Sequence, residues 1–324
     1  MALSEFELIR QLSDGLGATR AEVLLGVGDD AALVDVGQPE ALCVCVDTMI
    51  AGVHFPLDAP ADSVGHKILA VNLSDLAAMG ARPAWALLAL TLPGPDQAWL
   101  DGFRRGLSAL AAEHRVAVIG GDTTRGALSI SLTLAGWVEP AQALRRGGAR
   151  PDDLVFVSGS LGDAAAGLRL WQAGRVGQNG AAELADRLHR PQPRVALGRA
   201  LRGLATAAID VSDGLAADLG HILAASGVGA AIDLSALPLS EALRRGCGDA
   251  EAAVLALSGG DDYELCFTVP PEREPEVQAI SRELGLPLTC IGRIDAEPGL
   301  RVLGPGGRHL PLARAGYDHF GRSA

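Results

Sequence analysis

Short apolar runs of strand length alternate along this chain with longer stretches in which apolar residues recur at helical spacing. Runs such as Leu42–Val46, Trp85–Leu92 and Val116–Ile119 are bounded by glycine, proline or polar residues, and Gln97–Glu113 has the longer spacing. The first pattern is typical of buried strands and the second of amphipathic helices. Because the alternation is irregular, the sequence predicts a mixed α/β protein with two lobes.

The same patterns predict the remaining elements. Strands are expected at Val23–Val27, Ala31–Val36, Leu128–Val138, Leu154–Ser158, Ala207–Ile209, Gly229–Asp233, Tyr263–Val269 and Leu288–Ile294. Helices are expected at Glu5–Leu12, from Asp62 or Ser63 to about Met79, after Asp163, and over Val195–Gly203, 211–225, Ser240–Arg245 and Glu272–Leu284, with Asp96 as the N-cap of Gln97–Glu113. The glycine-containing loop Arg145–Gly148 predicts a boundary between an N-terminal domain, 1–148, and a C-terminal domain, 149–324.

Carboxylates follow the apolar runs at several points. In Val116–Arg125, VAVIGGDTTR, a buried strand is expected to stop at Gly120-Gly121, where the backbone turns tightly and leaves Asp122 at the strand's end. One Gly-Asp turn is equally compatible with ordinary turn chemistry. The pattern recurs, however, and the acids at strand ends or on largely apolar helices are Asp29, Asp30, Asp47, Asp75, Asp122, Asp210, Asp213 and Asp261.

Acids gathered at one edge of a fold repel one another unless divalent cations lie between them. Magnesium prefers such oxygen ligands and keeps phosphate oxygens among its other ligands. We therefore expect several Mg²⁺ ions to bind ATP in place of a phosphate-binding lysine, which supports direct phosphoryl transfer. The chain has neither G-x-x-x-x-G-K-[ST] nor G-x-G-x-x-G after a strand, and no Ser-His or Cys-His nucleophile pair is evident.

Composition narrows the classes of partner. The 324 residues are 48% hydrophobic and 20% charged, as in an ordinary globular protein, and the formal net charge of −12 disfavours a nucleic-acid partner. No apolar run approaches the ~20 residues of a membrane helix, and the N-terminus lacks a signal-peptide core, so no membrane association is expected. The five cysteines are odd in number and apolar in setting, which indicates reduced thiols and a cytoplasmic location.

The basic residues are unusual in kind. Lys67 is the one lysine among 27 basic residues, and the others are all arginine. A codon bias toward arginine explains the composition as a whole. The remaining lysine has a second interpretation, a site where a compact ammonium cannot be replaced by a guanidinium.

Seven segments together resemble the thiamine-monophosphate kinase family, within the aminoimidazole-ribonucleotide synthetase superfamily. They are GDDAAL (28–33), DTMIAGVHF (47–55), VNLSDLAAMGA (71–81), GGDTTRG (120–126), IDVSDGL (209–215), SGGDDYELCFT (258–268) and GYDHF (316–320). The resemblance implies ATP-dependent phosphorylation of thiamine monophosphate to thiamine diphosphate. It also implies two mixed α/β domains of the aminoimidazole-ribonucleotide-synthetase-like type, with a nucleotide cleft between them, and a homodimer formed through the N-terminal domain.

The matched motifs imply roles for individual residues. By this resemblance the metal ligands are Asp30, Asp47, Asp75, Asp122, Asp210 and Asp213, joined by the backbone carbonyls of Cys45 and Val46. The ATP-binding residues are His114, Gly121, Asp122, Arg146 and Ser212, and the substrate contacts are His54, Asp261 and Tyr317. Catalysis is expected to depend on Asp122, Asp210 and Asp213.

Some positions depart from the pattern of the family. Cys45 and Val46 stand where the family often has Thr or Ser, so only their backbone carbonyls could bind a metal. Asp261 stands where the family usually has Glu, and its side chain is shorter by one methylene. His114 stands where the family has a tyrosine near the adenine. None of these departures removes a carboxylate from the predicted cluster.

Two other functions are compatible with the same residues. One is a superfamily relative that uses ATP to activate another small substrate; relatives with a reactive cysteine near a terminus are disfavoured, because no cysteine of this chain lies near either end. The other is a non-catalytic magnesium–nucleotide sensor. Turnover of ATP with thiamine monophosphate separates the three functions.

Overall fold

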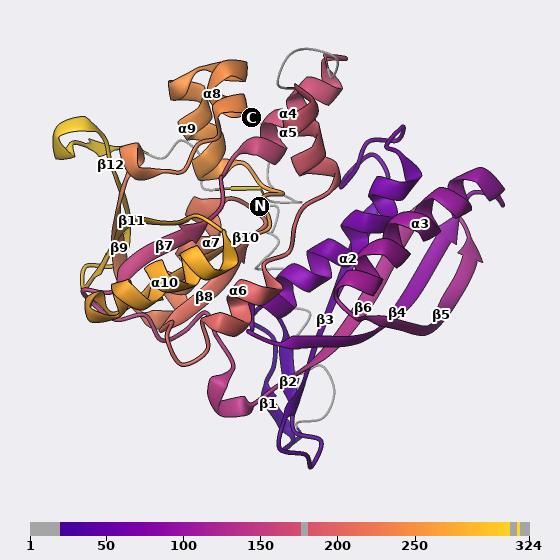
Figure 1. The fold of residues 1–324 in the computed structure, drawn as a ribbon, viewed down its shortest axis with the longest axis horizontal. Helices are drawn as coiled ribbons and strands as arrows, with labels where there is room; N and C mark the ends of the chain where they lie inside the picture. Colours follow the sequence, from indigo (N-terminus) through magenta and orange to yellow (C-terminus); the bar gives the residue numbers. More distant parts are fainter. Residues whose placement is uncertain (1–19, 176–180, 312–315, 318–324) are drawn as a thin grey trace, which may run out of the picture.

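The structure, a computed structural model, describes residues 20–175, 181–311, 316 and 317. It contains two β-sheets, one from each half of the chain, with helices packed between and around them (Figure 1). The helix expected at Glu5–Leu12 lies outside the described residues. Among the described residues, no helix combines the length and the hydropathy that crossing a membrane requires.

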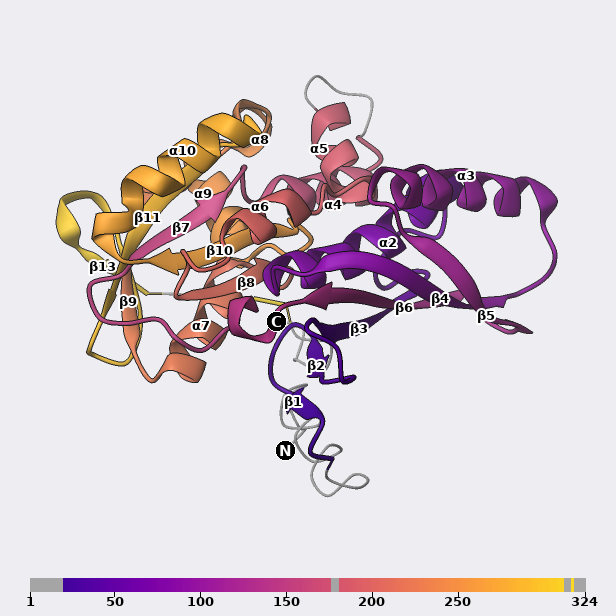
Figure 2. The ribbon, with the colours of Figure 1, turned by 60° about the horizontal axis from the view of Figure 1, so that its bottom comes forward.

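The first sheet has the strand order β1-β2-β3-β6-β4-β5. Its strands are β1 (Val23–Leu25), β2 (Ala32–Val34), β3 (Ala41–Ile50), β4 (Arg82–Leu92), β5 (Ala117–Arg125) and β6 (Ser129–Val138). Helices α2 (Ala61–Ala78) and α3 (Gln97–Glu113) lie on one face of this sheet (Figure 2). Glycines let the two helices approach closely: a Cβ on Gly65 would stand 2.0 Å from the carbonyl oxygen of Phe103.

The other face of the first sheet, here termed the open face, carries no helix among the described residues (Figure 2). Side chains alternate between the two faces of a strand. In β3, Cys45 is therefore buried under the helices, whereas Val46 points to the open face and is 62% exposed. Leu87 and Ile50 are exposed on the same face. The sheet thus leaves large apolar side chains uncovered in the single subunit.

The second sheet has the strand order β13-β12-β9-β11-β7-β10-β8. Its strands are β7 (Leu154–Ser158), β8 (Ala207–Val211), β9 (Gly229–Asp233), β10 (Glu264–Val269), β11 (Leu288–Asp295), β12 (Gly299–Leu303) and β13 (His309–Leu310). Helix α7 (Leu215–Ser226) covers one face, and α6 (Val195–Ala200) and α10 (Glu274–Leu284) cover the other (Figure 2). Val155 and Val157 accordingly join one hydrophobic cluster and Phe156 joins the other. The remaining helices are α4 (Asp163–Gln172), α5 (Ala181–His189), α8 (Glu241–Cys247) and α9 (Asp249–Ser258).

One hydrophobic cluster runs through both halves of the chain. It joins Leu76 of α2 to Phe156 and Phe267 of the second sheet. Glycine again allows a close approach, because a Cβ on Gly198 of α6 would stand 1.9 Å from the carbonyl oxygen of Ala77. This shared core sets the C-terminal part of α2 against the second sheet.

Three strands run on through the carboxylates that were expected to end them. Strand β3 continues through Asp47, β5 through Asp122 and β8 through Asp210. The expected turn at Gly120-Gly121 is wrong, because β5 stays paired with β4 as far as Arg125. An apolar run shows where a strand is buried, but it does not show how far a neighbouring strand continues to supply hydrogen bonds.

Other differences concern caps and additional elements. Helix α2 begins after Pro60, and no side chain caps it, so the predicted cap at Asp62 or Ser63 is wrong. Helices α5 and α9 and strands β12 and β13 are absent from the sequence-based prediction. Helix α3, in contrast, has the predicted bounds, and Asp96 accepts the backbone N–H of Trp99 as its N-cap.

Candidate active site

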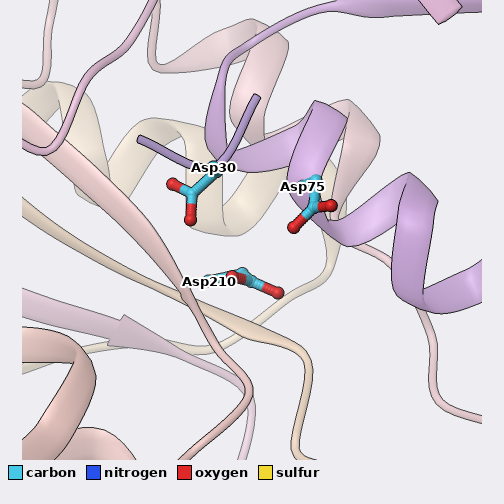
Figure 3. Close-up of side chains that lie close together, drawn as sticks. All are labelled: Asp30, Asp75 and Asp210. Carbon is cyan, nitrogen blue, oxygen red and sulfur yellow. The ribbon is translucent and has the colours of Figure 1, made fainter. Parts of the chain in front are cut away.

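Three carboxylates from three separate elements meet where α2 lies against β8 (Figure 3). Asp30 lies in the loop between β1 and β2, Asp75 in the last turn of α2, and Asp210 in β8. Each offers an oxygen atom, and the three oxygens lie within 4.8 Å of one another. The fold therefore brings together three residues that the sequence predicted to be metal ligands.

Hydrogen bonds hold the cluster in place. Ser74 Oγ donates to Asp210 Oδ2 at 2.7 Å, which ties α2 to β8. Arg146 Nη2 donates to Asp30 Oδ1 at 2.6 Å, and the backbone N–H of Arg146 donates to Asp29 Oδ2 at 3.2 Å. Arg146 thus orients the loop that carries both acids of the Gly-Asp-Asp motif.

Burial sets the electrostatics of these acids. It raises the pKa of Asp30 to about 8 and the pKa values of Asp47 and Asp210 to about 6 each. Burial also holds the pKa of Asp75 well above its usual range, and the charges of Asp47 and Asp210 raise it further. Among the described residues, Asp30 Oδ2 and Asp47 Oδ2 are buried without a hydrogen-bond partner. Buried carboxylate oxygens without donors are costly alone and suit a hard divalent cation, so these residues fit Mg²⁺.

A cavity of about 350 Å³ is lined by Asp47, the acid whose charge acts on Asp75 of the cluster. Its lining includes the three predicted substrate contacts, His54, Asp261 and Tyr317, and two further predicted residues, Ser212 and Asp213. The lining comes from β3 and the segment that follows it, helices α2 and α4, the turn before α7, the loop before β10 and the C-terminal tail. Residues that are distant in the sequence thus share one cavity next to the acids.

A buried acid that the sequence analysis missed organises the turn before α7. Asp218 Oδ2 accepts the backbone N–H groups of Ser212, Asp213 and Gly214 at 3.0, 3.1 and 3.0 Å. These bonds orient Ser212 and Asp213 toward the cavity that both line. The available signal was an acid in the first turn of a helix, where free backbone N–H groups need acceptors.

The loop before β10 is strained where it borders the cavity. Asp261 (φ 70°) and Tyr263 (φ 50°) both lie in the left-handed region, which costs a residue with a side chain about 1–2 kcal/mol. The Asp261 backbone N–H donates to the carbonyl oxygen of Ser212 at 2.8 Å, and Tyr263 Oη donates to Asp261 Oδ1 at 3.1 Å. These bonds hold the Asp261 carboxylate at the cavity. Tyr263 also lines the cavity and is a second residue that the sequence analysis missed.

Tyr317 reaches the cavity from the C-terminal tail. Its backbone N–H donates to the carbonyl oxygen of Asp213 at 3.0 Å, and the residue is half exposed. A Cβ on Gly316 would stand 2.6 Å from the Cβ of Ala217, so glycine lets the tail lie directly on α7. The last three residues of the GYDHF segment lie outside the described residues.

Three predicted residues lie elsewhere in the single subunit. His114 follows the last turn of α3 and lines a separate cavity of about 470 Å³ together with His66 and Arg190. Gly121 and Asp122 lie on β5, an edge strand that is exposed along its whole length. Their roles in nucleotide and metal binding stay predictions.

The register of the first sheet sets the position of Asp122. Asp122 pairs with Ala89, Ala89 with Ser131, and Ser131 with Thr48. Three strand spacings therefore separate Asp122 from Thr48, a distance of about 14 Å. Paired residues point to the same face, and Thr48 points to the open face while its neighbour Asp47 points to the helix side. Asp122 accordingly faces away from the acid cluster of its own subunit.

The predicted carbonyl ligands lie in the middle of the first sheet. Strand β2 pairs with β3 only over Leu42–Val44, so β2 does not cover the β3 backbone at Cys45 and Val46. On its other edge β3 pairs with β6 along its whole length. The metal-binding role of the two carbonyls stays a prediction.

Comparison with known proteins identifies the family. Residues 28–138 match the N-terminal domain family described as AIR synthase related protein, and residues 150–304 match the corresponding C-terminal domain family. Thiamine-monophosphate kinases of Salmonella typhimurium and Escherichia coli are 46% and 47% identical to this chain, and each comparison covers 99% of both chains. The chain belongs to the thiamine-monophosphate kinase family.

Solved structures of thiamine-monophosphate kinases share the fold. The crystal structure of the enzyme from Stenotrophomonas maltophilia is 50% identical, with a TM-score of 0.81 over 96% of this chain and 99% of that chain. A structure described as AaThiL complexed with AMPPCP and TMP is 33% identical, with a TM-score of 0.86 over 99% of each chain. These comparisons confirm the family, the fold class and the enzyme class, a kinase, that the sequence predicted.

Proposed function

We propose that this kinase transfers the γ-phosphoryl group of ATP directly to the phosphate of thiamine monophosphate, forming thiamine diphosphate and ADP. The relatives bear the substrate in their name, and the AaThiL structure contains the ATP analogue AMPPCP together with TMP. The observation that carries the proposal is the acid cluster next to a cavity lined by His54, Asp261 and Tyr317.

The acids of the cluster are the residues that would hold Mg²⁺. They are Asp30, Asp75 and Asp210, with Asp47 and Asp213 at the border of the cavity. Bound Mg²⁺ would offset the charge of the triphosphate and polarise its γ-phosphate. The buried oxygens of Asp30 and Asp47 that have no donor among the described residues support this assignment.

The remaining residues of the site position the reactants. A phosphate oxygen of the acceptor is already ionised at neutral pH, so the reaction requires no protein nucleophile. That oxygen bonds to the γ-phosphorus while the bond to the β–γ bridging oxygen breaks, and ADP keeps the electron pair. Such a transfer depends on position and charge. Arg146 at the cluster and the turn that Asp218 holds, Ser212–Gly214, are suited to bind the nucleotide phosphates.

We infer that the kinase works as a homodimer in which each subunit supplies Gly121 and Asp122 to its partner's site. Two features of the subunit support this arrangement. Asp122 faces the open side of the sheet, and β5 is an exposed edge strand. The open face also exposes Val46 and Leu87, which pairing through the N-terminal sheets would bury.

The cytoplasmic location stays a prediction from the sequence. All five cysteines are free thiols, which is in keeping with a reducing compartment.

A change on the open face is expected to separate the subunits. At micromolar concentration the protein should scatter light with twice the subunit mass of 33.3 kDa. The double variant Val46→Asp/Leu87→Asp should be monomeric and inactive, because charges on this face cannot be buried without a partner charge. Val254→Asp, at a valine on α9 that is 56% exposed, serves as the control and should remain dimeric. A monomeric wild-type protein would contradict the dimer.

Tyr317 is expected to contact the thiamine part of the substrate. The cationic thiazolium and the aminopyrimidine both suit an aromatic face. Tyr317→Ala should raise KM for thiamine monophosphate by the loss of roughly 1–2 kcal/mol, with KM for ATP nearly unchanged. Tyr317→Phe should be close to neutral, since the ring rather than the hydroxyl makes the contact. An alanine variant that loses thermal stability at unaltered KM would identify Tyr317 as a tail anchor instead.

A coupled assay of ADP release tests the function itself. ATP and Mg²⁺ are supplied with thiamine, thiamine monophosphate or thiamine diphosphate, and the products are separated by chromatography. We expect ADP release with thiamine monophosphate, matched by an equal amount of thiamine diphosphate. If ADP is released at the same rate with and without these three compounds, the result would favour a relative with another substrate. ATP binding without ADP release would favour a sensor.

A further inference from the structure

The only lysine of the chain lies in the wall of the proposed substrate cavity. Lys67 belongs to α2, and its side chain is 4% exposed. Its Nζ lies 2.9 Å from Asp261 Oδ1 and donates to the carbonyl oxygen of His54 at 3.3 Å. Both neighbours are predicted substrate contacts, so the ammonium stands where these two parts of the cavity meet.

The contacts hold the ammonium without using all of its donors. A lysine ammonium has three N–H groups, and here it has two partners, the Asp261 carboxylate in an ion pair and the His54 carbonyl oxygen in a hydrogen bond. Among the described residues, the third has none. Asp261 is itself held by Tyr263 and Ser212, so a rigid acceptor from the second half of the chain fixes a donor from the first half. The remaining N–H is available to a group bound in the cavity.

The charges around the cavity favour a role for this cation in binding phosphate. Of the described residues that line the cavity, Asp47, Asp213 and Asp261 are acids, and Lys67 is the only lysine or arginine. The acceptor phosphate of thiamine monophosphate must approach the triphosphate of ATP, and the two anions repel each other. A buried ammonium offsets this repulsion more strongly than an exposed one, because water screens it less.

The size of the group explains why it is a lysine. The other basic residues of the chain are all arginine, so the composition itself favours arginine. A guanidinium is wide and planar, whereas an ammonium is a compact point charge. The ammonium lies 2.9 Å from Asp261 Oδ1 and 3.3 Å from the His54 carbonyl oxygen, and the Lys67 side chain is only 4% exposed. An arginine could not bring its charge to the same point.

We propose that Lys67 is a catalytic residue that binds the acceptor phosphate through its third N–H and stabilises its charge during phosphoryl transfer. As the acceptor oxygen bonds to the γ-phosphorus, the bond to the β–γ bridging oxygen breaks and ADP leaves with the electron pair. No proton passes to or from Lys67. The inference rests on the proposed function and adds a residue to it. The alternative is that Lys67 and Asp261 form a bridge that only holds the two halves of the chain together.

The test compares Lys67→Met, Lys67→Arg and Lys67→Ala with the wild-type protein at saturating Mg²⁺. Lys67→Met should lower kcat/KM for thiamine monophosphate by about 100-fold or more, with KM for ATP changed by no more than about 3-fold. Lys67→Arg should lose about 10-fold although its charge is kept. Propylammonium should restore part of the activity of Lys67→Ala in a saturable manner, whereas tetramethylammonium, which has no N–H donor, should not.

A matched control separates catalysis from structure. Arg202 Nε donates to the carbonyl oxygen of Gly80 at 2.6 Å and so also links the two halves, but it does not line the cavity. Arg202→Met should lower thermal stability without changing kcat/KM for thiamine monophosphate. The proposal is wrong if Lys67→Met behaves like this control or if Lys67→Arg has wild-type activity. It is also wrong if propylammonium restores no more activity to Lys67→Ala than tetramethylammonium does.

Measuring the activity of the wild-type protein separates a failure of the proposed function from a failure of the inference about Lys67. If the wild-type protein does not phosphorylate thiamine monophosphate, the proposed function fails. If the wild-type protein phosphorylates it and the Lys67 variants do so equally well, the function stands and the inference about Lys67 fails.

Discussion

Asp122→Asn is expected to abolish phosphoryl transfer while the fold and the dimer remain intact. The residue is exposed on an edge strand, so an amide of the same shape disturbs no internal packing. If the carboxylate binds the metal–phosphate group of the partner's site, its removal should lower kcat by at least about 100-fold. The coupled assay measures the loss, and thermal melting and light scattering verify fold and assembly. Turnover like that of the wild type would remove Asp122 from the site.

Mixed dimers show which subunit uses Asp122. In the proposed dimer, Asp75 and Asp122 of one site come from different subunits. When a subunit with Asp75→Asn pairs with a subunit with Asp122→Asn, both substitutions fall in one site and the other site is intact. Coexpression of two inactive variants should therefore restore about a quarter of wild-type activity, since half of the dimers are mixed and each has one good site of two. If Asp122 acted within its own chain, the mixture would remain inactive.

Mg²⁺ is expected to stabilise the folded protein strongly at pH 8 and weakly at pH 5. Burial raises the pKa of Asp30 to about 8, against an ordinary value of 3.8, and raises the pKa of Asp75 as well. The folded state then binds more protons than the unfolded state between these pH values, so the stability of the metal-free protein falls from about pH 4 to about pH 8. A bound divalent cation offsets the charge of the ionised acids and so removes this loss of stability. We expect 10 mM Mg²⁺ to raise Tm by about 5 °C or more at pH 8.

Asp75→Asn should reduce both the Mg²⁺ effect on Tm and the activity. The amide needs no counter-charge, so the metal-free variant should be more stable at pH 8 than the metal-free wild type, while kcat falls by at least about 100-fold. Glu241→Gln, at an exposed acid on α8, is the control and should leave the Mg²⁺ effect unchanged. Equal stabilisation of wild type and Asp75→Asn would show that the cation binds elsewhere.

Local chemistry was enough to predict much of the fold and of the site. The bounds of α3 follow from its helical spacing and from Asp96, because a cap acts within one turn. Asp30, Asp75 and Asp210 stood out because carboxylates are rare after apolar runs and on apolar helices, and the structure brings their oxygens together. The order of the motifs was sufficient for the family, since it does not depend on any contact between them.

Contacts between distant segments explain what the sequence did not predict. Gly120-Gly121 suggested a turn because glycine permits one. In the fold, Gly121 (φ 150°) serves a close approach instead, since a Cβ there would stand 1.8 Å from the carbonyl oxygen of Leu88. Asp218 and Tyr263 have partners close by in the sequence, the turn at 212–214 and the Asp261 carboxylate. Their part in the site depends instead on the turn before α7 and the loop before β10 meeting at one cavity, which only the fold brings about.

The sequence by itself determined which residue types this kinase offers to its substrates: the acids, the one lysine and the motifs of its family. Only the tertiary structure decided where in the molecule each of these residues lies. It set Lys67 against Asp261, directed Asp122 to the open face, and put His114 in a different cavity from His54. The physical reason is that side-chain chemistry and local spacing are properties of the chain itself. Burial, strand register and the face of a sheet to which a side chain points arise only when segments far apart in the sequence pack together.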